Sequence, residues 1–237
     1  MPLEFVRPSA MPATANFLLF GPPGTGKTVG ACSGPGPVLV LNAEGPGAMR
    51  KAREIHPDAE IREVAVTGKS VLDEAYLYLR DGAGKDVRTV VVDTVGEVYR
   101  ILLEEFGGER PTLQQYGDTN IVVERFVRAL RDLDVNVVLV AHEETIVDGT
   151  TGETMRQPVT GGKKLPGQLM AQVDVVGYTG VITEEGKPPR FVAQLIDSGG
   201  RRCKDRSGRL GTVRAVDISE WLRTMHVAPA NANRKAA

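Results

Sequence analysis

Eight residues near the beginning of the chain have the types and spacing that bind the phosphates of a nucleotide. They are Gly21-Pro22-Pro23-Gly24-Thr25-Gly26-Lys27-Thr28, which satisfy the pattern G-x-x-x-x-G-K-[ST]. In such a loop the glycines let backbone N–H groups turn toward a triphosphate, Lys27 places a cation at the β- and γ-phosphates, and the Thr28 hydroxyl ligates Mg²⁺. The apolar run 17–20 before the loop is the strand that the motif requires, so a bare Gly/Pro turn is the weaker interpretation. We predict a site for ATP and Mg²⁺, although no motif distinguishes ATP from GTP.

Two acids follow other apolar runs and complete the predicted site. The run 89–92 ends in Asp93, whose carboxylate is expected to hold the same Mg²⁺ as Thr28; a strand-end cap is the alternative. Because Thr94 follows Asp93, the chain lacks the Asp-Glu pair that would place a water-activating acid there. Glu44 follows the apolar run 38–41 and is the candidate for that task, with a solvated loop acid as the alternative.

The hydrophobic pattern predicts strands that alternate with helices and then a series of strands. The expected strands span 17–20, 38–41, 61–66, 89–94, 137–140, 173–178, 191–196 and 212–216. Expected helices begin at Lys27, at Ser70 with a capping-box spacing to Asp73, behind Asp93, at Thr119 and at Ser219. Residues 107–118 read as a polar loop, and 145–168 as a mobile hairpin or loop that carries Lys163 and Lys164. This order predicts a mainly parallel, doubly wound α/β sheet with antiparallel strands added toward the C-terminus.

Composition limits the classes of protein to consider. The 237 residues suffice for one large domain, expected over 16–227, with an N-terminal arm at 1–15 and a disordered tail at 228–237. A formal net charge of −1 gives no global attraction to nucleic acid, so any such binding needs local cations. Two cysteines without a framework suit the reducing cytoplasm, and no apolar run is long enough to cross a membrane.

The order of these motifs resembles that of the RecA-like ATPases. The likeness is closest to minimal phage-encoded RecA-like proteins, including the Sak-type single-strand annealing ATPases. It rests on the Gly-Pro-Pro-Gly-Thr-Gly-Lys-Thr loop, a short first helix, the strand 38–41 that leads to Glu44, and a late Lys-Asp-Arg at 204–206. It covers about Asn16 to Arg209.

The resemblance implies roles for five residues. Glu44 would be the base that polarises the attacking water, and Asp93 the partner of Mg²⁺. His142 falls where the family places a sensor of the γ-phosphate, usually Gln; a structural strand-end histidine is the alternative. Lys204 and Arg206 resemble a basic finger inserted into a neighbouring subunit's ATP site, and a solvated basic turn is the alternative.

The expected function is that of a cytoplasmic, Mg²⁺-dependent ATPase that is stimulated by DNA. By resemblance it would form a homo-oligomer, a ring or a filament, and bind single-stranded DNA in phage recombination or replication by annealing or strand handling, with a single-strand-binding protein as a further candidate partner. Lys163 and Lys164 are the candidate DNA cations, and Tyr116 and Tyr178 the candidate stacking residues. Two rivals are an ATP-gated loader or adaptor with little turnover, and a small-molecule kinase whose residues 201–206 form a lid.

Overall fold

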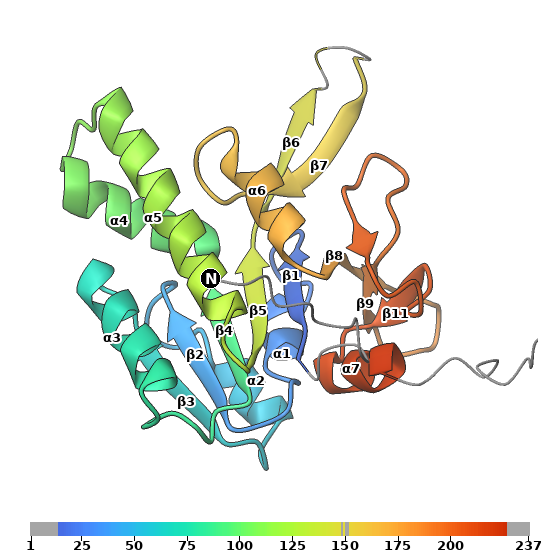
Figure 1. Cartoon of the computed structure of the whole chain (residues 1–237). Coiled ribbons are helices and arrows are strands. Elements are labelled where there is room, and N and C mark those ends of the chain that lie inside the picture. Colours follow the sequence, from blue (N-terminus) through green and yellow to red (C-terminus); the bar gives the residue numbers. More distant parts are fainter. Residues whose placement is uncertain (1–13, 148, 150–151, 227–237) are drawn as a thin grey trace, which may run out of the picture.

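The computed structural model of the chain describes residues 14–147, 149 and 152–226. Within these residues, nine strands form one sheet whose path runs β11-β9-β8-β1-β5-β4-β2-β3, with β10 paired to β8 (Figure 1). The strands of the sheet are β1 (Asn16–Phe20), β2 (Val38–Asn42), β3 (Ile61–Ala65), β4 (Thr89–Asp93), β5 (Asn136–Ala141), β8 (Val175–Ile182), β9 (Arg190–Gln194), β10 (Lys204–Asp205) and β11 (Val213–Ala215).

Six of these strands, β3-β2-β4-β5-β1-β8, are parallel, and β9, β10 and β11 are antiparallel additions at one side. The predicted fold class is therefore confirmed. The continuous apolar runs of β2, β4 and β5 are buried along their whole length, as expected for parallel strands covered on both faces. Strands β4 and β5 lie between β1 and β2, so the chain leaves β1 and returns to the sheet beyond both of them. Such a crossing places the end of β1 at a switch point where α/β sheets bind ligands.

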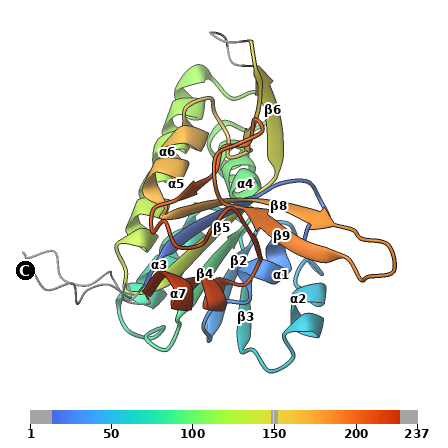
Figure 2. The same cartoon turned by 90° about the vertical axis from the view of Figure 1, so that its right-hand side faces the viewer.

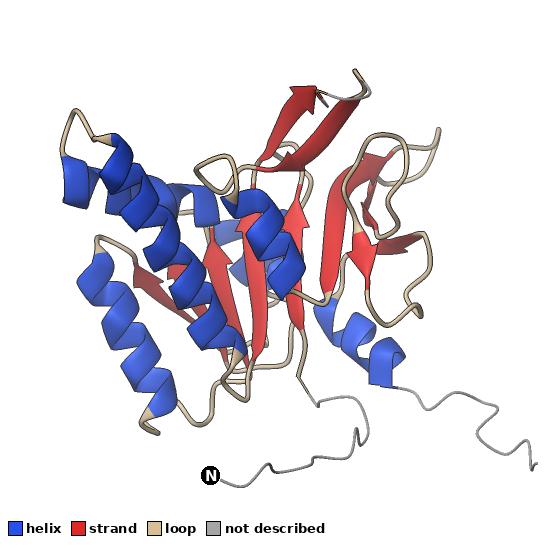
Figure 3. Cartoon of the chain, turned by 45° about the horizontal axis from the view of Figure 1, so that its top comes forward, coloured by secondary structure: helices blue, strands red, loops and turns tan. Residues whose placement is uncertain are grey.

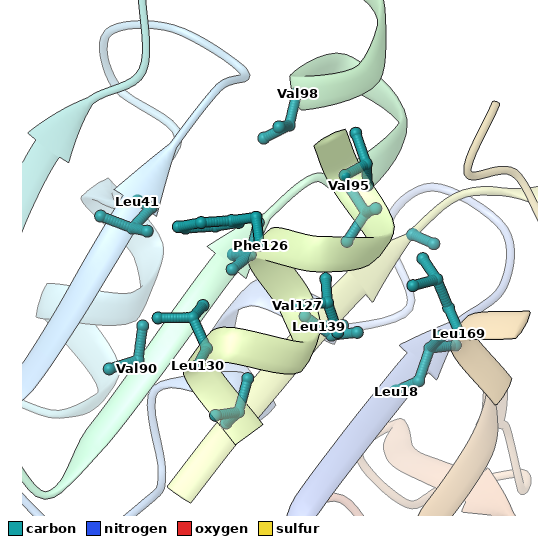
Figure 4. Packing of buried hydrophobic residues seen from close by; sticks show 14 of the residues in the cluster. Leu18, Leu41, Val90, Val95, Val98, Phe126, Val127, Leu130, Leu139 and Leu169 are labelled. Atoms are coloured by element: carbon teal, nitrogen blue, oxygen red, sulfur yellow. The ribbon is translucent and has the colours of Figure 1, made fainter. Parts of the chain in front are cut away.

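Helices cover both faces of the sheet. Their bounds are α1 (Lys27–Ala31), α2 (Arg50–Ile55), α3 (Lys69–Arg80), α4 (Val95–Gly107), α5 (Leu113–Arg131), α6 (Leu165–Gln172) and α7 (Ile218–His226). Helices α3, α4, α5 and α6 pack on the face that carries Leu18, Leu41 and Leu139 (Figures 3 and 4). Helices α1, α2 and α7 pack on the other face around Phe17 and the fully buried Trp221. Alternate residues of one buried strand thus enter two separate cores.

Three predictions about helices are wrong or incomplete. The predicted loop 107–118 contains the start of α5, because Thr112 and Gln115 form a capping box that begins the helix at Leu113. The expected capping box at Ser70 does not form, since α3 begins one residue earlier behind Gly68, and Lys69 pairs with Asp73 instead. The cap of α7 is supplied by the Asp217 carboxylate, which accepts from the Glu220 N–H at 2.8 Å.

The predicted hairpin or loop at 145–168 is partly a hairpin and partly a helix. Strands β6 (Glu143–Val147) and β7 (Thr154–Pro158) form a two-stranded antiparallel sheet of their own, which projects beyond the main sheet (Figure 1). Helix α6, which the sequence analysis missed, begins at Leu165 with Pro166 in its first turn. The predicted arm at 1–15, apart from its last two residues, and the predicted tail at 228–237 lie outside the described residues.

Candidate nucleotide site

The phosphate-binding loop is held on the end of β1 by a threonine from β8. The Thr25 hydroxyl lies 2.7 Å from the Thr179 hydroxyl, and Thr179 also donates to the Phe20 carbonyl. Gly21 passes so close to Thr179 that a β-carbon there would lie 2.6 Å from the Thr179 carbonyl oxygen. Gly26, at a φ of 79°, ends the loop in a left-handed conformation that favours glycine and precedes α1. Thr179 has no sequence motif, so only the structure reveals this anchor.

The registers of four neighbouring strands bring the predicted acids to this loop. Asp93 at the end of β4 pairs with Asn42 of β2 on one side and Val140 of β5 on the other, while Phe20 of β1 pairs with Ala141. Because these strands are parallel, their carboxyl ends share one edge. The residues that follow them meet there, as the sequence predicted for Thr28, Glu44, Asp93 and His142.

Asp93 and Thr28 form the centre of the site. The Thr28 hydroxyl donates to Oδ2 of Asp93 at 2.6 Å, and Asp93 is fully buried. Its other oxygen, Oδ1, is buried without a hydrogen-bond partner. The pKa of Asp93 is raised to about 6, mainly by burial and to a lesser extent by the nearby Glu44, while Thr28 and Lys27 act in the opposite direction. A buried carboxylate with one unsatisfied oxygen is a group that a cation would stabilise.

This pair fits Mg²⁺. A hydroxyl and a carboxylate oxygen are ligands that Mg²⁺ accepts, and the remaining positions would be filled by phosphate oxygens and water. Among the described residues there is no cluster of three His, Cys, Asp or Glu side chains that could hold a metal ion.

Glu44 and His142 contact each other across the site. Nε2 of His142 lies 2.8 Å from Oε1 of Glu44, and both side chains are partly exposed. Asn42 orients the loop that carries Glu44: its Oδ1 accepts from the Glu44 N–H at 2.9 Å, and its amide donates to the Gly45 carbonyl at 2.8 Å. Asn42 is buried and was missed by the sequence analysis, although an amide at a strand end next to a candidate base was a usable signal.

Lys27 lies among three carboxylates. Its ammonium donates to the carbonyls of Gly21 at 3.0 Å and Pro22 at 2.7 Å. Burial lowers the pKa of Lys27, while Asp93, Glu44 and Glu143 raise it. Glu143 was not among the predicted site residues. Its Oε2 is buried without a hydrogen bond and lies 3.6 Å from Arg156 of β7, so it links the loop's cation to the hairpin.

Lys204 and Arg206 lie away from this edge. Lys204 pairs with Val176 near the amino end of β8, whereas Tyr178 of β8 pairs with Phe20 beside the loop. The Lys204 ammonium donates to the Met170 carbonyl at 2.6 Å, and Arg206 forms an ion pair with Asp174 at 3.1 Å. The structure therefore does not bring the predicted finger to the nucleotide loop of the same chain.

The candidate DNA residues are divided by the structure. Lys163 and Lys164 are exposed at the start of α6, and the preceding glycines pack against α4 and α5: a β-carbon at Gly162 would lie 2.8 Å from the Asn120 amide. Tyr116, one helical turn before Asn120, is 41% exposed. Tyr178, by contrast, is buried against Phe20, and Arg156 and Arg201 lie over its ring, so it is no stacking candidate.

A cavity of about 530 Å³ connects the loop to α2 and β9. One part is lined by the site described above, and another by the side chains of Val29, Ala48, Ile55, His56, Phe191 and Val216. Of the described residues that line it, none comes from 201–206, which gives no support to a kinase lid made by that segment. In the part of the chain that the structure describes, no helix has the length and apolar character to span a membrane.

The mainly parallel sheet, the loop after β1 and the acid at the end of β4 define a P-loop NTPase of RecA-like type. The chain belongs to the AAA domain family AAA_24, whose model matches residues 13–209. The chain is also similar in fold to a solved structure described as an ATPase domain, with a TM-score of 0.52 and 14% sequence identity over 85% of this chain and 81% of that one. A search of curated proteins found no match.

The raised pKa of Asp93 predicts how the site affects stability. Because the folded protein binds this proton more tightly than the unfolded chain, with a pKa near 6 against 3.8, ionisation of Asp93 opposes folding as the pH rises through this window. Without Mg²⁺ or nucleotide, Asp93→Asn should raise the free energy of unfolding by about 2 to 3 kcal/mol at pH 8 and by far less at pH 4, as measured by urea denaturation. Asp58→Asn, at an exposed carboxylate, is the control. An equal effect of Asp93→Asn at both pH values would contradict this assignment.

Proposed function

We propose that this protein hydrolyses ATP with Mg²⁺ and acts on single-stranded DNA as a homo-oligomer. The observation that supports the hydrolysis is the convergence of Thr28, Asp93, Glu44 and His142 on the end of β1 beside Lys27. It supplies a phosphate cradle, two metal ligands, a candidate base and a polar side chain in contact with that base. Family membership supports ATPase activity, whereas the DNA and the assembly are our own inferences.

The residues divide the reaction between them. The loop N–H groups and Lys27 would hold the phosphates, and Thr28 with Asp93 would hold Mg²⁺, which neutralises charge on the phosphates. Glu44 would accept a proton from the water that attacks the γ-phosphate. His142 contacts Glu44 and directly precedes β6, so its contact with Glu44 or the phosphate would report the state of the nucleotide to the hairpin.

The proposed DNA surface lies beside the hairpin. The exposed Lys163 and Lys164 follow glycines that pack against α4 and α5, and Tyr116 belongs to α5. Two cations and an exposed ring therefore share this region. Cations that follow the phosphates together with rings that stack on bases are the usual means of binding single strands. Strand annealing or strand handling in phage recombination or replication is the role that we assign to this surface, by resemblance alone.

The proposed assembly would place Lys204 and Arg206 in a neighbour's site. Their distance from the loop of their own chain agrees with a role in trans, and Arg206 remains 60% exposed although it pairs with Asp174. A cation that arrives only on assembly would couple hydrolysis to oligomerisation. A loader or adaptor that binds ATP with little turnover is the rival that the contact between Glu44 and His142 favours, because it occupies the candidate base.

Glu44→Gln should retain ATP binding but reduce hydrolysis by roughly 10² to 10⁴, because the amide keeps the shape of the side chain and cannot accept the proton. Phosphate release and a fluorescent-nucleotide titration, each with and without single-stranded DNA, measure the two effects and the expected stimulation. Lys27→Ala should lose binding as well.

Two matched variants control this test. Glu97 in the first turn of α4 pairs with Arg100, and Glu143 faces Lys27, so neither is assigned as the base. If Glu97→Gln or Glu143→Gln shows the slow hydrolysis and Glu44→Gln does not, the base is misassigned. If the parent protein binds ATP and never hydrolyses it, the loader is the better function.

Replacing both Lys163 and Lys164 by alanine should lower the slope of log affinity for single-stranded DNA against log salt by about 1.4. This value is the loss of two phosphate contacts multiplied by the single-strand factor of roughly 0.7.

Tyr116→Ala should weaken binding by about 1 to 3 kcal/mol at any salt concentration, because stacking is not ionic. Fluorescence anisotropy measures both. Lys85→Ala with Arg88→Ala removes two exposed cations before β4, at the opposite edge of the sheet, and should leave the slope unchanged. The proposed surface is wrong if the two double variants behave alike.

Mixing two inactive variants tests the finger. Glu44→Gln removes the base and Arg206→Ala removes the finger, so each homo-oligomer should be nearly inactive. For Arg206→Ala the rate of hydrolysis should fall by about 10³, as for other arginine fingers. In a mixed assembly some interfaces join an intact Glu44 to an intact Arg206, and part of the ATPase activity should return. Co-purification of differently tagged variants confirms mixing. Mixed assemblies that stay inactive would show that Arg206 does not act across an interface.

A further inference from the structure

The cavity beside the phosphate loop contains apolar side chains that phosphates and Mg²⁺ do not require. Phe191 of β9 is 46% exposed and Ile55 at the end of α2 is 51% exposed, and both line the same cavity. Val29, Ala48 and Val216 add further apolar lining. Large apolar side chains that stay exposed on two elements around one hollow indicate a ligand with an apolar surface.

Phe191 is fixed to the phosphate loop itself. A β-carbon at Gly26 would lie 3.1 Å from Cδ1 of Phe191, so the ring lies in contact with the last glycine of the loop. Val216 is joined to Phe191 by a backbone hydrogen bond of 3.4 Å and packs against Gly30 of α1. The hairpin of β8 and β9 that carries Phe191 projects from the sheet beside α1 and α2 (Figure 2).

The other side of the hollow is also fastened to α1. The ring of His56, directly after α2, bonds through Nε2 to the carbonyl of Val29 at 2.9 Å. Ile55, its neighbour in sequence, is therefore held next to the helix whose first residues are Lys27 and Thr28. Both apolar sides thus have a set position relative to the place where the phosphates would bind.

We propose that Phe191 and Ile55 form a slot for the base of the nucleotide, and that this slot accepts adenine and guanine alike. The inference rests on the proposed nucleotide site, and it adds the part of the substrate that the phosphate loop does not read. Aromatic side chains stack on the flat faces of bases, and every base has such a face.

Two polar side chains line the slot, and each already has a partner within the chain. His56 uses Nε2 for the Val29 carbonyl, and the Lys51 ammonium pairs with Glu54 at 2.7 Å. Discrimination between adenine and guanine needs donors and acceptors fixed at the base edge. A slot that acts by contact area prefers two-ring bases to one-ring bases. ATP and GTP should then bind within about threefold of each other, and CTP and UTP several-fold more weakly.

The experiment compares nucleotides with inorganic tripolyphosphate, which has the phosphates and lacks the base. Calorimetric titrations with Mg²⁺ would use the parent protein, Phe191→Ala, Ile55→Ala and the control Ile182→Ala. Ile182 is a partly exposed apolar residue of the same hairpin and is absent from the described residues that line the cavity. Phe191→Ala should weaken ATP and GTP by about tenfold and leave tripolyphosphate within twofold, with a smaller effect of the same kind for Ile55→Ala and none for Ile182→Ala.

The outcomes separate this inference from the proposed function. If the parent binds neither ATP nor tripolyphosphate, the nucleotide site itself is wrong. If the parent binds both and Phe191→Ala binds ATP normally, the slot is wrong and the nucleotide site stands. An equal loss of affinity for ATP and for tripolyphosphate in Phe191→Ala would show that the ring supports the loop and does not contact the base. A difference of more than tenfold between ATP and GTP would overturn the lack of purine selectivity.

Discussion

The site depends on one carboxyl group, that of Asp93, which the fold buries in surroundings that favour its neutral form. Asp93 is enclosed at the end of a strand with neighbours on both sides, and Thr28 satisfies only one of its oxygens. A cation at this point would restore the charge-compensating environment that burial removes. The order of the sheet makes this contact possible: β4 lies two positions from β1, and Asp93 at its end reaches Thr28 after the loop that follows β1.

Much of this arrangement could be predicted from the sequence because its signals are local. The loop pattern, the uninterrupted apolar strands and the acids that follow them are each contained in a few neighbouring residues, and the rule that parallel strands share a carboxyl edge joins them. The start of α5 was missed because residues 107–118 are polar and contain Pro111, which suggested a loop, although the spacing of Thr112 and Gln115 indicated a cap. Helix α6 was missed because the segment 145–168 is rich in Gly and Thr, and because Pro166 and Gly167 stand in the first turn of the helix.

The contacts that could not be predicted join residues far apart in the chain. Thr25 meets Thr179, Gly26 meets Phe191, and Glu44 meets His142. None of these pairs has a characteristic spacing, because each depends on which strands become neighbours. Tyr178 was misjudged for a related reason: its burial comes from Phe20 on the adjacent strand and from two arginines supplied by the hairpin and the segment after β9.

The hairpin of β6 and β7 joins the sheet beside His142, and Arg156 in its second strand also forms backbone hydrogen bonds with Gly200 and Arg202 after β9. Its first residue follows His142 directly, and the residue after its last, Val159, donates its N–H to the His142 carbonyl at 2.8 Å. Both strands of the hairpin thus leave the end of β5 next to His142. Residue pairs added or deleted beyond Val147 and Thr154 would change its reach and leave the contacts of Arg156 with Tyr178 and Gly200 in place. The arrangement allows the length of this arm to diverge in evolution while the chemistry at its base stays unchanged.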